Sequence, residues 1–323
     1  MILVLIEHDQ GEVSKASYEA LTFARNLGDD QLAAVVIGDD VEEMAEELNE
    51  YGVTDAYIFD DSDLEEYAPA AWGRCISQVV EAESPAAVVA TGTDRGNEVM
   101  AHLGAMLGLP MCANVLEGDF DDDYSVTRVR WGGSLLEEAT ISGETKLLTV
   151  APLSVDASTV DNDEDVEIHE MDVEVEDDDM RVQIVRREVP EQDGVSLTDA
   201  KIVVSGGRGV GSAEGFEALE ALATLVDGAV GCSRAVTNNG WRPHADQVGQ
   251  TGNRVAPDLY IANGISGASQ HMAGCAAAKN LLVINIDPEA PILSRADYAI
   301  IGDLHEVLPA ITAEVKKIKS KKR

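Results

Sequence analysis

The stretch from Asp246 to His271 contains the residues of this chain that best fit ligand binding by type and spacing. Two loops rich in glycine, hydroxyl and amide side chains flank a short apolar strand predicted at Leu259–Ala262. Glycine lets the backbone approach a ligand closely, and the hydroxyls and amides between the glycines supply hydrogen-bond donors and acceptors. The stretch therefore indicates a cofactor cradle, although the same residue types are also common in ordinary turns.

Other loops of the C-terminal half follow predicted strands, which is where open parallel sheets bind their ligands. After the first strand, the run 205–212 brings backbone amides and Arg208 toward an anion such as a pyrophosphate. It is not a strict G-x-G-x-x-G fingerprint, because Ser212 occupies the last glycine position. Arg234 is either a solvated charge or faces an electron-rich ring whose reduced form is anionic. Asp303 either caps the last helix or accepts a hydrogen bond from adenine or ribose. Loops that converge on one rim favour a large dinucleotide.

The elements around these loops predict a two-domain α/β fold. The N-terminal domain, residues 1–197, is a mostly parallel, nucleotide-binding-like sheet covered on both faces, with an antiparallel addition. The C-terminal domain, residues 198–323, is a Rossmann-like, doubly wound domain. The predicted N-terminal strands are 2–6, 32–37, 56–59 and 86–90, the helices are 15–27, 41–50 and 68–82, and the antiparallel addition is 124–131, 137–141 and 146–151. The predicted C-terminal strands are 201–204, 229–231, 259–262, 281–286 and 298–301, and the helices are 216–226, 269–278 and 304–319.

Two charged segments stand out. Residues 156–179 hold thirteen acidic residues and no Lys or Arg, which is typical of a solvated segment. The spacing of Val166, Ile168, Val173 and Val175 nevertheless allows an edge strand with its acids toward water. The tail at 316–323 carries six of the 23 basic residues, which either complement the dipole of the last helix or contact an acidic partner.

The overall charge is strongly negative, with 60 acidic and 23 basic residues and a formal net charge of −37. Such a surface repels nucleic acid and anionic membranes, and it suggests adaptation to a salt-rich cytoplasm. No apolar run approaches the roughly 20 residues of a membrane span, and the N-terminus lacks the basic region of a signal peptide, so we expect a cytoplasmic protein. The four cysteines lack metal or disulfide spacing and are expected to be small buried residues.

A series of motifs extends over the C-terminal half: S-G-G-R-G (205–209), S-R (233–234), G-W-R-P (240–243), Q-V-G-Q-T-G (247–252), P-D-L-Y-I-A (257–262), G-I-S-G-A-x-Q-H (264–271), N-x-D-P-E-A-P-I (285–292), A-D-Y (296–298) and G-D-L (302–304). Together with T-G-T-D-R-G at 91–96, the series resembles the α subunit of electron transfer flavoprotein, the FixB family. The resemblance implies FAD bound chiefly by the C-terminal domain and a heterodimer with a β subunit. It implies an electron carrier without substrate chemistry of its own, which accepts electrons from flavin dehydrogenases, such as the acyl-CoA dehydrogenases of fatty acid β-oxidation. The electrons then pass to a quinone oxidoreductase or another acceptor.

The same resemblance implies the cofactor contacts by position. Arg208 would touch the diphosphate and flavin region, Ser233 and Arg234 would flank the isoalloxazine, and Gln250 and Thr251 would bind the O4 and N5 edge, in a loop with Val248 and Gly249. Ser266, Gly267, Ala268, Ser269 and Gln270 would hold the ribityl chain and phosphates. His271 would lie near flavin O2, where a positive or donor group stabilises the anionic semiquinone. Asn285, Asp303 and Leu304 would bind the AMP half. Asn263 departs from the small or aliphatic residue expected before Gly264, outside these ligand contacts.

Three alternatives remain at this point. The chain could be the α subunit of an electron-bifurcating flavoprotein, which these motifs do not separate from a simple carrier. An NAD-dependent oxidoreductase is less favoured, because no catalytic His–Asp or Tyr–Lys arrangement lies outside the flavin loops. A nucleotide-binding sensor module would suit the N-terminal half alone, where 92–97 would touch a nucleotide or else serve packing and β-subunit contact.

Overall fold

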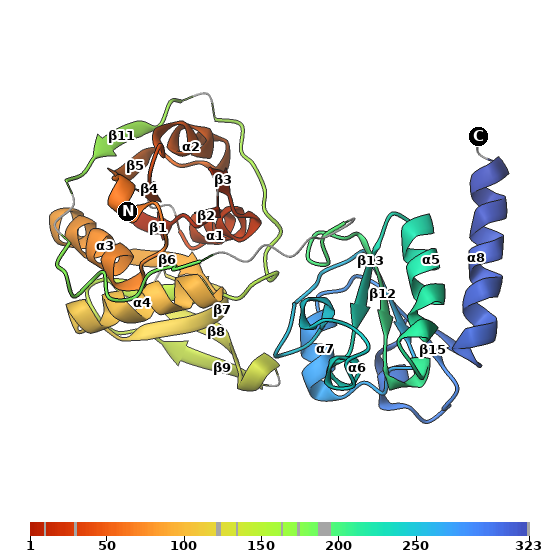
Figure 1. Cartoon of the computed structure of the whole chain (residues 1–323). Coiled ribbons are helices and arrows are strands. Elements are labelled where there is room, and N and C mark those ends of the chain that lie inside the picture. The colour runs from red at the N-terminus through yellow and green to blue at the C-terminus, as the bar shows by residue number, and fades with distance from the viewer. Residues whose placement is uncertain are drawn as a thin grey trace. The chain divides into compact units, whose positions relative to one another are not determined.

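The chain forms two compact units, Met1–Glu188 and Val189–Arg323, each with its own sheet and hydrophobic core (Figure 1). The computed structural model describes residues 1–9, 11–28, 31–120, 124–133, 135–162, 164–172, 175–186 and 195–321. The predicted two-domain α/β fold is confirmed, and the second unit begins at Val189 where the sequence suggests residue 198.

The first unit is built on a nine-stranded sheet. The strands from β11 to β7 run parallel, and β8 and β9 continue the sheet in antiparallel orientation. Across the sheet the strands are β11 (Glu167–Glu170), β5 (Asp55–Asp60), β4 (Leu32–Gly38), β1 (Ile2–Leu5), β6 (Ala87–Thr91), β10 (Lys146–Val150), β7 (Met111–Asp119), β8 (Ser125–Arg130) and β9 (Leu135–Thr140). A small hairpin pairs β2 (His8–Asp9) with β3 (Glu12–Val13).

Helices cover both faces of this sheet. Alternate residues of the central strand β1 explain why, since Ile2 and Val4 pack into one core and Leu3 and Leu5 into the other. The first core includes residues of α1 (Lys15–Arg25) and α2 (Glu42–Glu46), which continues as a 3-10 helix, Glu47–Tyr51. The second core includes residues of α3 (Pro69–Glu83) and α4 (Asp94–Leu107).

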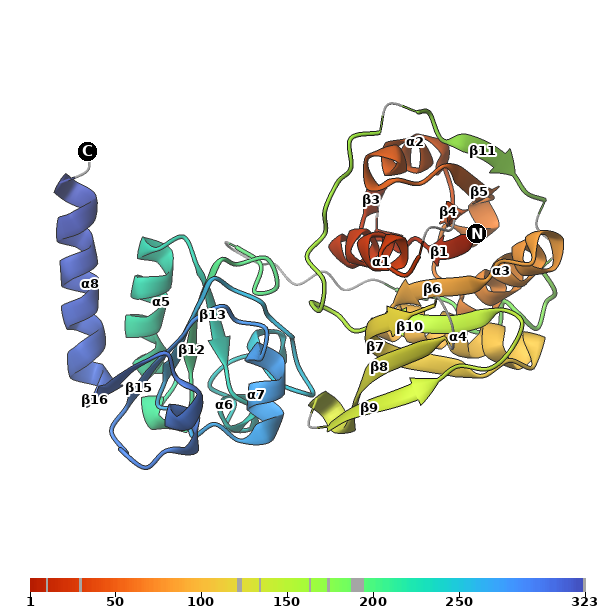
Figure 2. The same cartoon turned by 180° about the vertical axis from the view of Figure 1, so that it is seen from behind.

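The structure corrects the prediction for 146–151. These residues are predicted in an antiparallel addition, but β10 runs parallel between β6 and β7 (Figure 2). All five residues of β10 are buried, as expected for a strand in the interior of a parallel sheet. Only β8 and β9 form the antiparallel addition.

The motif at 91–96 leads into helix α4, which the sequence analysis does not predict. Thr93 caps this helix, since its Oγ1 accepts a hydrogen bond of 2.9 Å from the Gly96 amide. A Cβ atom at Gly92 would lie 2.3 Å from the Val150 carbonyl oxygen, and one at Gly96 would lie 2.2 Å from the Thr91 carbonyl oxygen. Packing therefore accounts for both glycines without a bound nucleotide.

The acidic segment contributes the edge strand that the sequence allows. Strand β11 pairs with β5 in parallel, while Val166 is buried and Ile168 packs against the same core. His169 Nε2 lies 3.0 Å from Asp55 Oδ1 on β5. Val173, one of the four predicted apolar positions, lies outside the described residues, and Val175 lies beyond the end of β11 and packs against the second core.

The second unit has a five-stranded, fully parallel sheet between two layers of helices. Its order is β13 (Ala229–Cys232), β12 (Ile202–Gly206), β14 (Leu259–Asn263), β15 (Leu281–Asn285) and β16 (Tyr298–Ile301). Helices α5 (Glu217–Leu225) and α8 (Leu304–Lys321) lie side by side on one face, and α7 (Ser269–Cys275) packs on the other (Figures 1 and 2). A short helix that the sequence does not indicate, α6 (Arg234–Asn238), follows β13.

Two further features of the described residues bear on function. All four cysteines are buried and free, as the sequence predicts. None of the helices in the described ranges combines the length and the apolar character that crossing a bilayer requires.

Candidate cofactor-binding site

A cavity of about 490 Å³ opens at the carboxyl ends of the strands in the second unit. The chain runs from β12 outward to β13 and then crosses to β14 on the other side of β12. Such a reversal of strand order leaves a crevice between the two central strands, and open α/β sheets bind ligands there. The volume lies within the range of ordinary ligand pockets. The cavity is lined by Arg208, Gly209, Ser233, Arg234, Ala235, Gln247, Val248, Gly249, Gln250, Thr251, Gly264, Ile265, Ser266, Ala268, Gln270, His271, Asn285, Asp287, Ala290 and Pro291.

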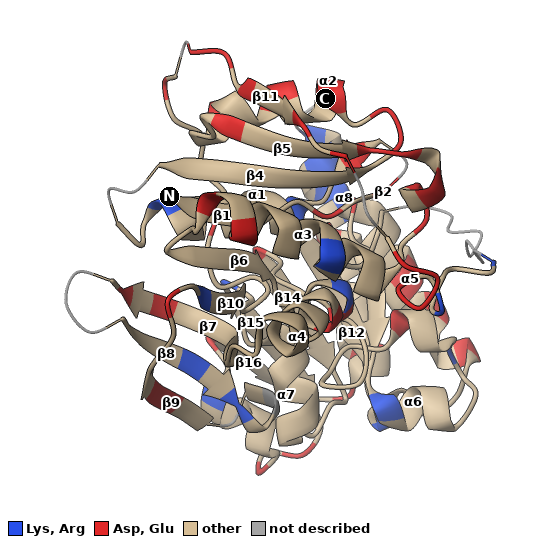
Figure 3. Cartoon of the chain, turned by 90° about the vertical axis from the view of Figure 1, so that its left-hand side faces the viewer, with Lys and Arg blue, Asp and Glu red and all other residues tan. Residues whose placement is uncertain are grey.

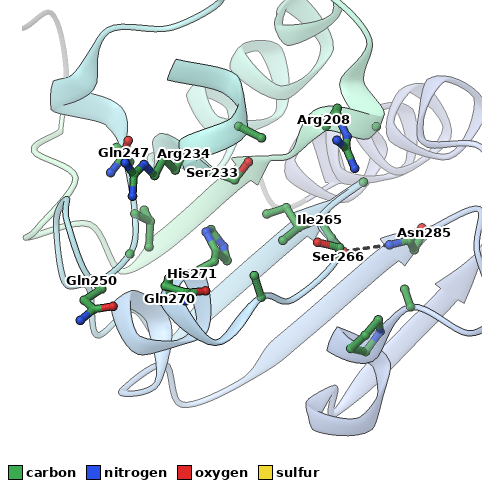
Figure 4. A pocket seen from close by; sticks show the side chains of 18 of the residues that line it. Arg208, Ser233, Arg234, Gln247, Gln250, Ile265, Ser266, Gln270, His271 and Asn285 are labelled. Atoms are coloured by element: carbon green, nitrogen blue, oxygen red, sulfur yellow. Dashed lines mark hydrogen bonds between the residues drawn. The ribbon is translucent and has the colours of Figure 1, made fainter. Parts of the chain in front are cut away.

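Most of the site residues predicted from sequence meet in this cavity, as Figure 4 shows for side chains that come from separate loops. The predicted residues among those that line it are Arg208, Ser233, Arg234, Val248, Gly249, Gln250, Thr251, Ser266, Ala268, Gln270, His271 and Asn285.

Four predicted residues lie outside the cavity lining. Gly267 has φ +86°, and a Cβ atom there would lie 2.6 Å from Ile292 Cβ, so it serves loop packing. Ser269 is exposed at the start of α7. Asp303 Oδ1 accepts a 2.9 Å hydrogen bond from the His305 amide and so begins α8, while Leu304 is buried in the core. Direct contacts of these four residues with a cofactor stay a prediction.

The loop after β12 packs against the loop after β14. The Gly207 amide donates to the Asn263 carbonyl at 2.8 Å, and the Gly209 amide donates to the Gly264 carbonyl at 3.1 Å. A Cβ atom at Gly207 would come within 2.3 Å of the Gly264 carbonyl oxygen. These two amides are therefore used inside the protein, and the group that this loop offers an anion is the exposed guanidinium of Arg208.

The cavity has a positive character in a strongly acidic chain. Arg208 and Arg234 both line it, and neither has an acidic partner among the described residues. The one carboxylate in the lining, Asp287, accepts a 2.9 Å hydrogen bond from the Glu289 amide. Two cations without counter-charges fit a ligand that carries phosphate groups.

The loop at 247–253 is held in place by the buried side-chain amide of Gln247. Gln247 Oε1 accepts from the Thr237 hydroxyl at 2.7 Å, and Gln247 Nε2 donates to Thr251 Oγ1 at 3.1 Å. The Gln250 amide donates to the Gln270 carbonyl at 2.7 Å, which ties the loop to α7. The side chains of Gln250 and Thr251 remain exposed at the cavity.

His271 combines burial with an unpaired nitrogen. It is 6 % exposed, its Nε2 lies 3.1 Å from the Tyr260 hydroxyl, and its Nδ1 has no hydrogen-bond partner among the described residues. Burial lowers the pKa of His271 to about 4, against the opposing effect of the Val248 backbone. The imidazole is therefore neutral at pH 7 and acts by hydrogen bonding.

Asn285 holds the wall of the cavity. Its Nδ2 donates to the Ile265 carbonyl at 2.9 Å (Figure 4). Its Oδ1 accepts from the Asp287 amide at 3.0 Å. Both side-chain atoms thus bond to the protein, so Asn285 positions the loop that carries Ser266.

Sequence reasoning missed eight lining residues, although most lie inside motifs that it used. Gln247 begins the Q-V-G-Q-T-G run, and Asp287, Ala290 and Pro291 belong to the N-x-D-P-E-A-P-I run. The others are Gly209, Ala235, Gly264 and Ile265, which adjoin predicted residues.

Comparison with known proteins agrees with this geometry. Residues 196–276 match the family model of the electron transfer flavoprotein FAD-binding domain, and residues 2–176 match that of the electron transfer flavoprotein domain. The chain belongs to the electron transfer flavoprotein α-subunit family. It is 36% identical over 321 residues to electron transfer flavoprotein subunit alpha of Bacillus subtilis, with 98% of each chain covered. It is 34% identical over 326 residues to protein FixB of Clostridium saccharobutylicum, with 98% of this chain and 96% of the relative covered.

The FAD cofactor predicted from the sequence is confirmed by the match to the FAD-binding domain of electron transfer flavoprotein. The residues present also fit FAD on physical grounds. Arg208 suits its diphosphate and Arg234 an electron-rich ring, since neither has an acidic partner among the described residues. His271 Nδ1, which has no partner in that part of the chain, and the exposed amide of Gln250 suit the polar edges of a flavin ring.

Proposed function

We propose that this chain is the FAD-binding subunit of a heterodimeric electron carrier. Its partner is an electron transfer flavoprotein β subunit, and both work in the cytoplasm. The carrier accepts electrons from flavin dehydrogenases, such as acyl-CoA dehydrogenases, and passes them to a quinone oxidoreductase or another acceptor. The observation that carries the proposal is a cavity lined by Arg208 and Arg234, which lie in the matched FAD-binding domain and have no acidic partner among the described residues.

We propose the following contacts with the cofactor. Arg208 binds the diphosphate, because this residue is exposed after the end of β12 and has no acidic partner in the part of the chain that the structure describes. Ser233 and Arg234 flank the isoalloxazine, Gln250 and Thr251 bind its O4 and N5 edge, and His271 lies at O2. Ser266 and the backbone from Gly267 to Gln270 hold the ribityl chain and phosphates, and Asn285, Asp303 and Leu304 face the AMP half.

The bound flavin supplies the redox chemistry, and the protein sets its potential and its access. Arg234 places a positive charge at the ring, which favours added negative charge. Neutral His271 offers a hydrogen bond without donating a proton. The ionisable side chains of the lining are two arginines, one histidine with a lowered pKa and Asp287. This set has no pair of groups suited to acid and base roles, which supports a carrier over an enzyme with its own substrate chemistry.

Electron entry tests the proposal. The complex with the β subunit, loaded with FAD, is mixed with an acyl-CoA dehydrogenase and its substrate, and the flavin absorbance is followed. We expect bleaching only when both dehydrogenase and substrate are present, and recovery when quinone oxidoreductase and quinone are added. Omission of the dehydrogenase is the control.

Direct bleaching by NADH would contradict the simple carrier. It would favour the two alternatives left by the sequence, a bifurcating flavoprotein or an NAD-dependent oxidoreductase. The number of FAD molecules per heterodimer separates those two alternatives, because bifurcation requires a second flavin.

A further inference from the structure

Tyr260 is a fully buried tyrosine whose polar end lies next to the cofactor cavity. It sits in strand β14, with 0 % exposure, in the core beneath α7. Burying a phenol hydroxyl without a hydrogen-bond partner is unfavourable. A buried tyrosine is therefore expected to use its hydroxyl in a hydrogen bond, because phenylalanine would otherwise fill the same space without that cost.

The partner of the Tyr260 hydroxyl is His271 Nε2, 3.1 Å away. Burial raises the pKa of Tyr260 far above its ordinary value, so the phenol keeps its proton. The phenol has one proton to donate, and His271 Nε2 is the hydrogen-bond partner that the described residues give it.

A neutral imidazole carries one proton, on one of its two nitrogens. If Nε2 accepts from Tyr260, the ring proton resides on Nδ1. His271 Nδ1 is the buried nitrogen that has no partner among the described residues, and His271 lines the cavity. This N–H makes no hydrogen bond of ordinary geometry to the described residues, and the Val248 backbone, which raises the pKa of His271, is the acceptor that competes with a ligand for it.

We propose that Tyr260 is a positioning residue that fixes the tautomer of His271, so that Nδ1–H is presented as a hydrogen-bond donor to a carbonyl oxygen of the bound flavin. This inference rests on the proposed FAD function for the identity of the acceptor. The tautomer itself belongs to the protein and exists without the cofactor. An N–H donor held by the protein next to the flavin carbonyl oxygen stabilises negative charge on that oxygen, and it does so while His271 stays neutral.

Nuclear magnetic resonance of the ring nitrogens tests the tautomer. The full chain is labelled with ¹⁵N-histidine and assembled with unlabelled β subunit. The signals of His271, one of six histidines in the chain, are assigned by their loss in His271→Gln. We expect protonated Nδ1 and unprotonated Nε2 in the wild type, and a mixture of tautomers in Tyr260→Phe. A wild-type ring protonated at Nε2 would overturn the proposal.

A double-mutant cycle tests whether Tyr260 acts through His271. Tyr260→Phe should weaken FAD binding on the order of tenfold, the effect of one buried hydrogen bond, and lower the flavin potential. His271→Gln carries its own N–H donor, so adding Tyr260→Phe to it should leave FAD affinity and potential unchanged. Equal losses in both backgrounds would show that Tyr260 only packs, and would overturn the proposal. If the wild type binds no FAD, the proposed function fails, while the tautomer measurement still decides this inference.

Discussion

At the scale of single residues, the site depends on cations that the protein leaves unpaired. Several arginines of the described residues make no salt bridge, and two of them, Arg208 and Arg234, line one cavity. The sequence analysis left Arg234 either solvated or facing an electron-rich ring. The structure places it on the wall of the cavity, at the start of α6, which favours the second interpretation.

Replacing Arg234 tests this role. Arg234→Ala should lower the reduction potential of the bound flavin by an amount on the order of tens of millivolts, because the charge that favours the reduced ring is removed. Redox titration of the FAD-loaded complex measures the change. Arg234→Lys keeps the charge and should retain most of the potential. An alanine variant with the wild-type potential would contradict the role.

The sequence indicated many of the side chains that line the cavity, but not the hydrogen-bond partners that hold them. Arg208, Gln250 and Thr251 all line it, and their contacts with FAD stay a prediction. Gln247 was missed because its role in holding the loop depends on two features that a loop sequence does not reveal. These are the burial of its side chain and its hydrogen bond with Thr237, ten positions earlier. Asp303 could be read as a cap or a ligand, and the structure shows that it at least begins α8.

At the scale of elements, the site is formed where the loop at 247–253 meets α7. The contact is close, since a Cβ atom at Gly274 would lie 2.2 Å from the Gly249 amide nitrogen and 2.5 Å from Gly249 Cα. Gly249 itself has φ +149°, in the region that favours glycine. These glycines let the loop lie directly on the helix, which places Gln250 and Thr251 at the cavity.

Gly274→Ala should therefore push the loop away from α7. We expect a loss of about 1–3 kcal/mol in the free energy of unfolding, which is typical of overpacking, together with weaker FAD binding. Denaturant unfolding and FAD titration measure the two effects. Gly302→Ala is the matched control, because its Cβ atom would meet only Val307 Cγ2 at 3.4 Å, an ordinary contact. Wild-type affinity and stability in Gly274→Ala would contradict this account of the loop.

Most strands and helices of both units could be predicted from apolar runs in the sequence and from the residues that interrupt these runs. Two kinds of feature could not be predicted in this way. The orientation of β10 depends on pairing with residues 59 and 36 positions earlier in the chain, which an apolar run does not specify, and so the antiparallel prediction was wrong. Helices α4 and α6 begin within motifs that look like ligand loops, and their helical character follows from a capping threonine in α4 and from packing of Val236 in α6. Strand β11 was allowed by the spacing of its apolar residues and is confirmed.

At the scale of the whole molecule, the charge of −37 is the dominant property. Acidic residues are concentrated along α2 and β11, as the red segments of Figure 3 show. At low ionic strength their mutual repulsion opposes the compact state, and salt shortens its range from about 10 Å at 0.1 M to about 3 Å at 1 M.

We therefore expect the unfolding temperature to rise with potassium chloride concentration. Thermal unfolding followed by circular dichroism across a salt series measures this dependence. Sucrose at matched osmolarity is the control, since it strengthens burial without screening charge and should stabilise less. Full stability in dilute buffer would count against adaptation to a salt-rich cytoplasm.

The central claim is that FAD occupies the cavity of the second unit. The most direct measurement is the amount of FAD per chain in the purified complex, compared between Ala268→Trp and Ala277→Trp. Both alanines are exposed, but only Ala268 lines the cavity. The account predicts one FAD in this subunit for the wild type and Ala277→Trp, and little or none for Ala268→Trp. A colourless wild-type complex, or full FAD in Ala268→Trp, would contradict it.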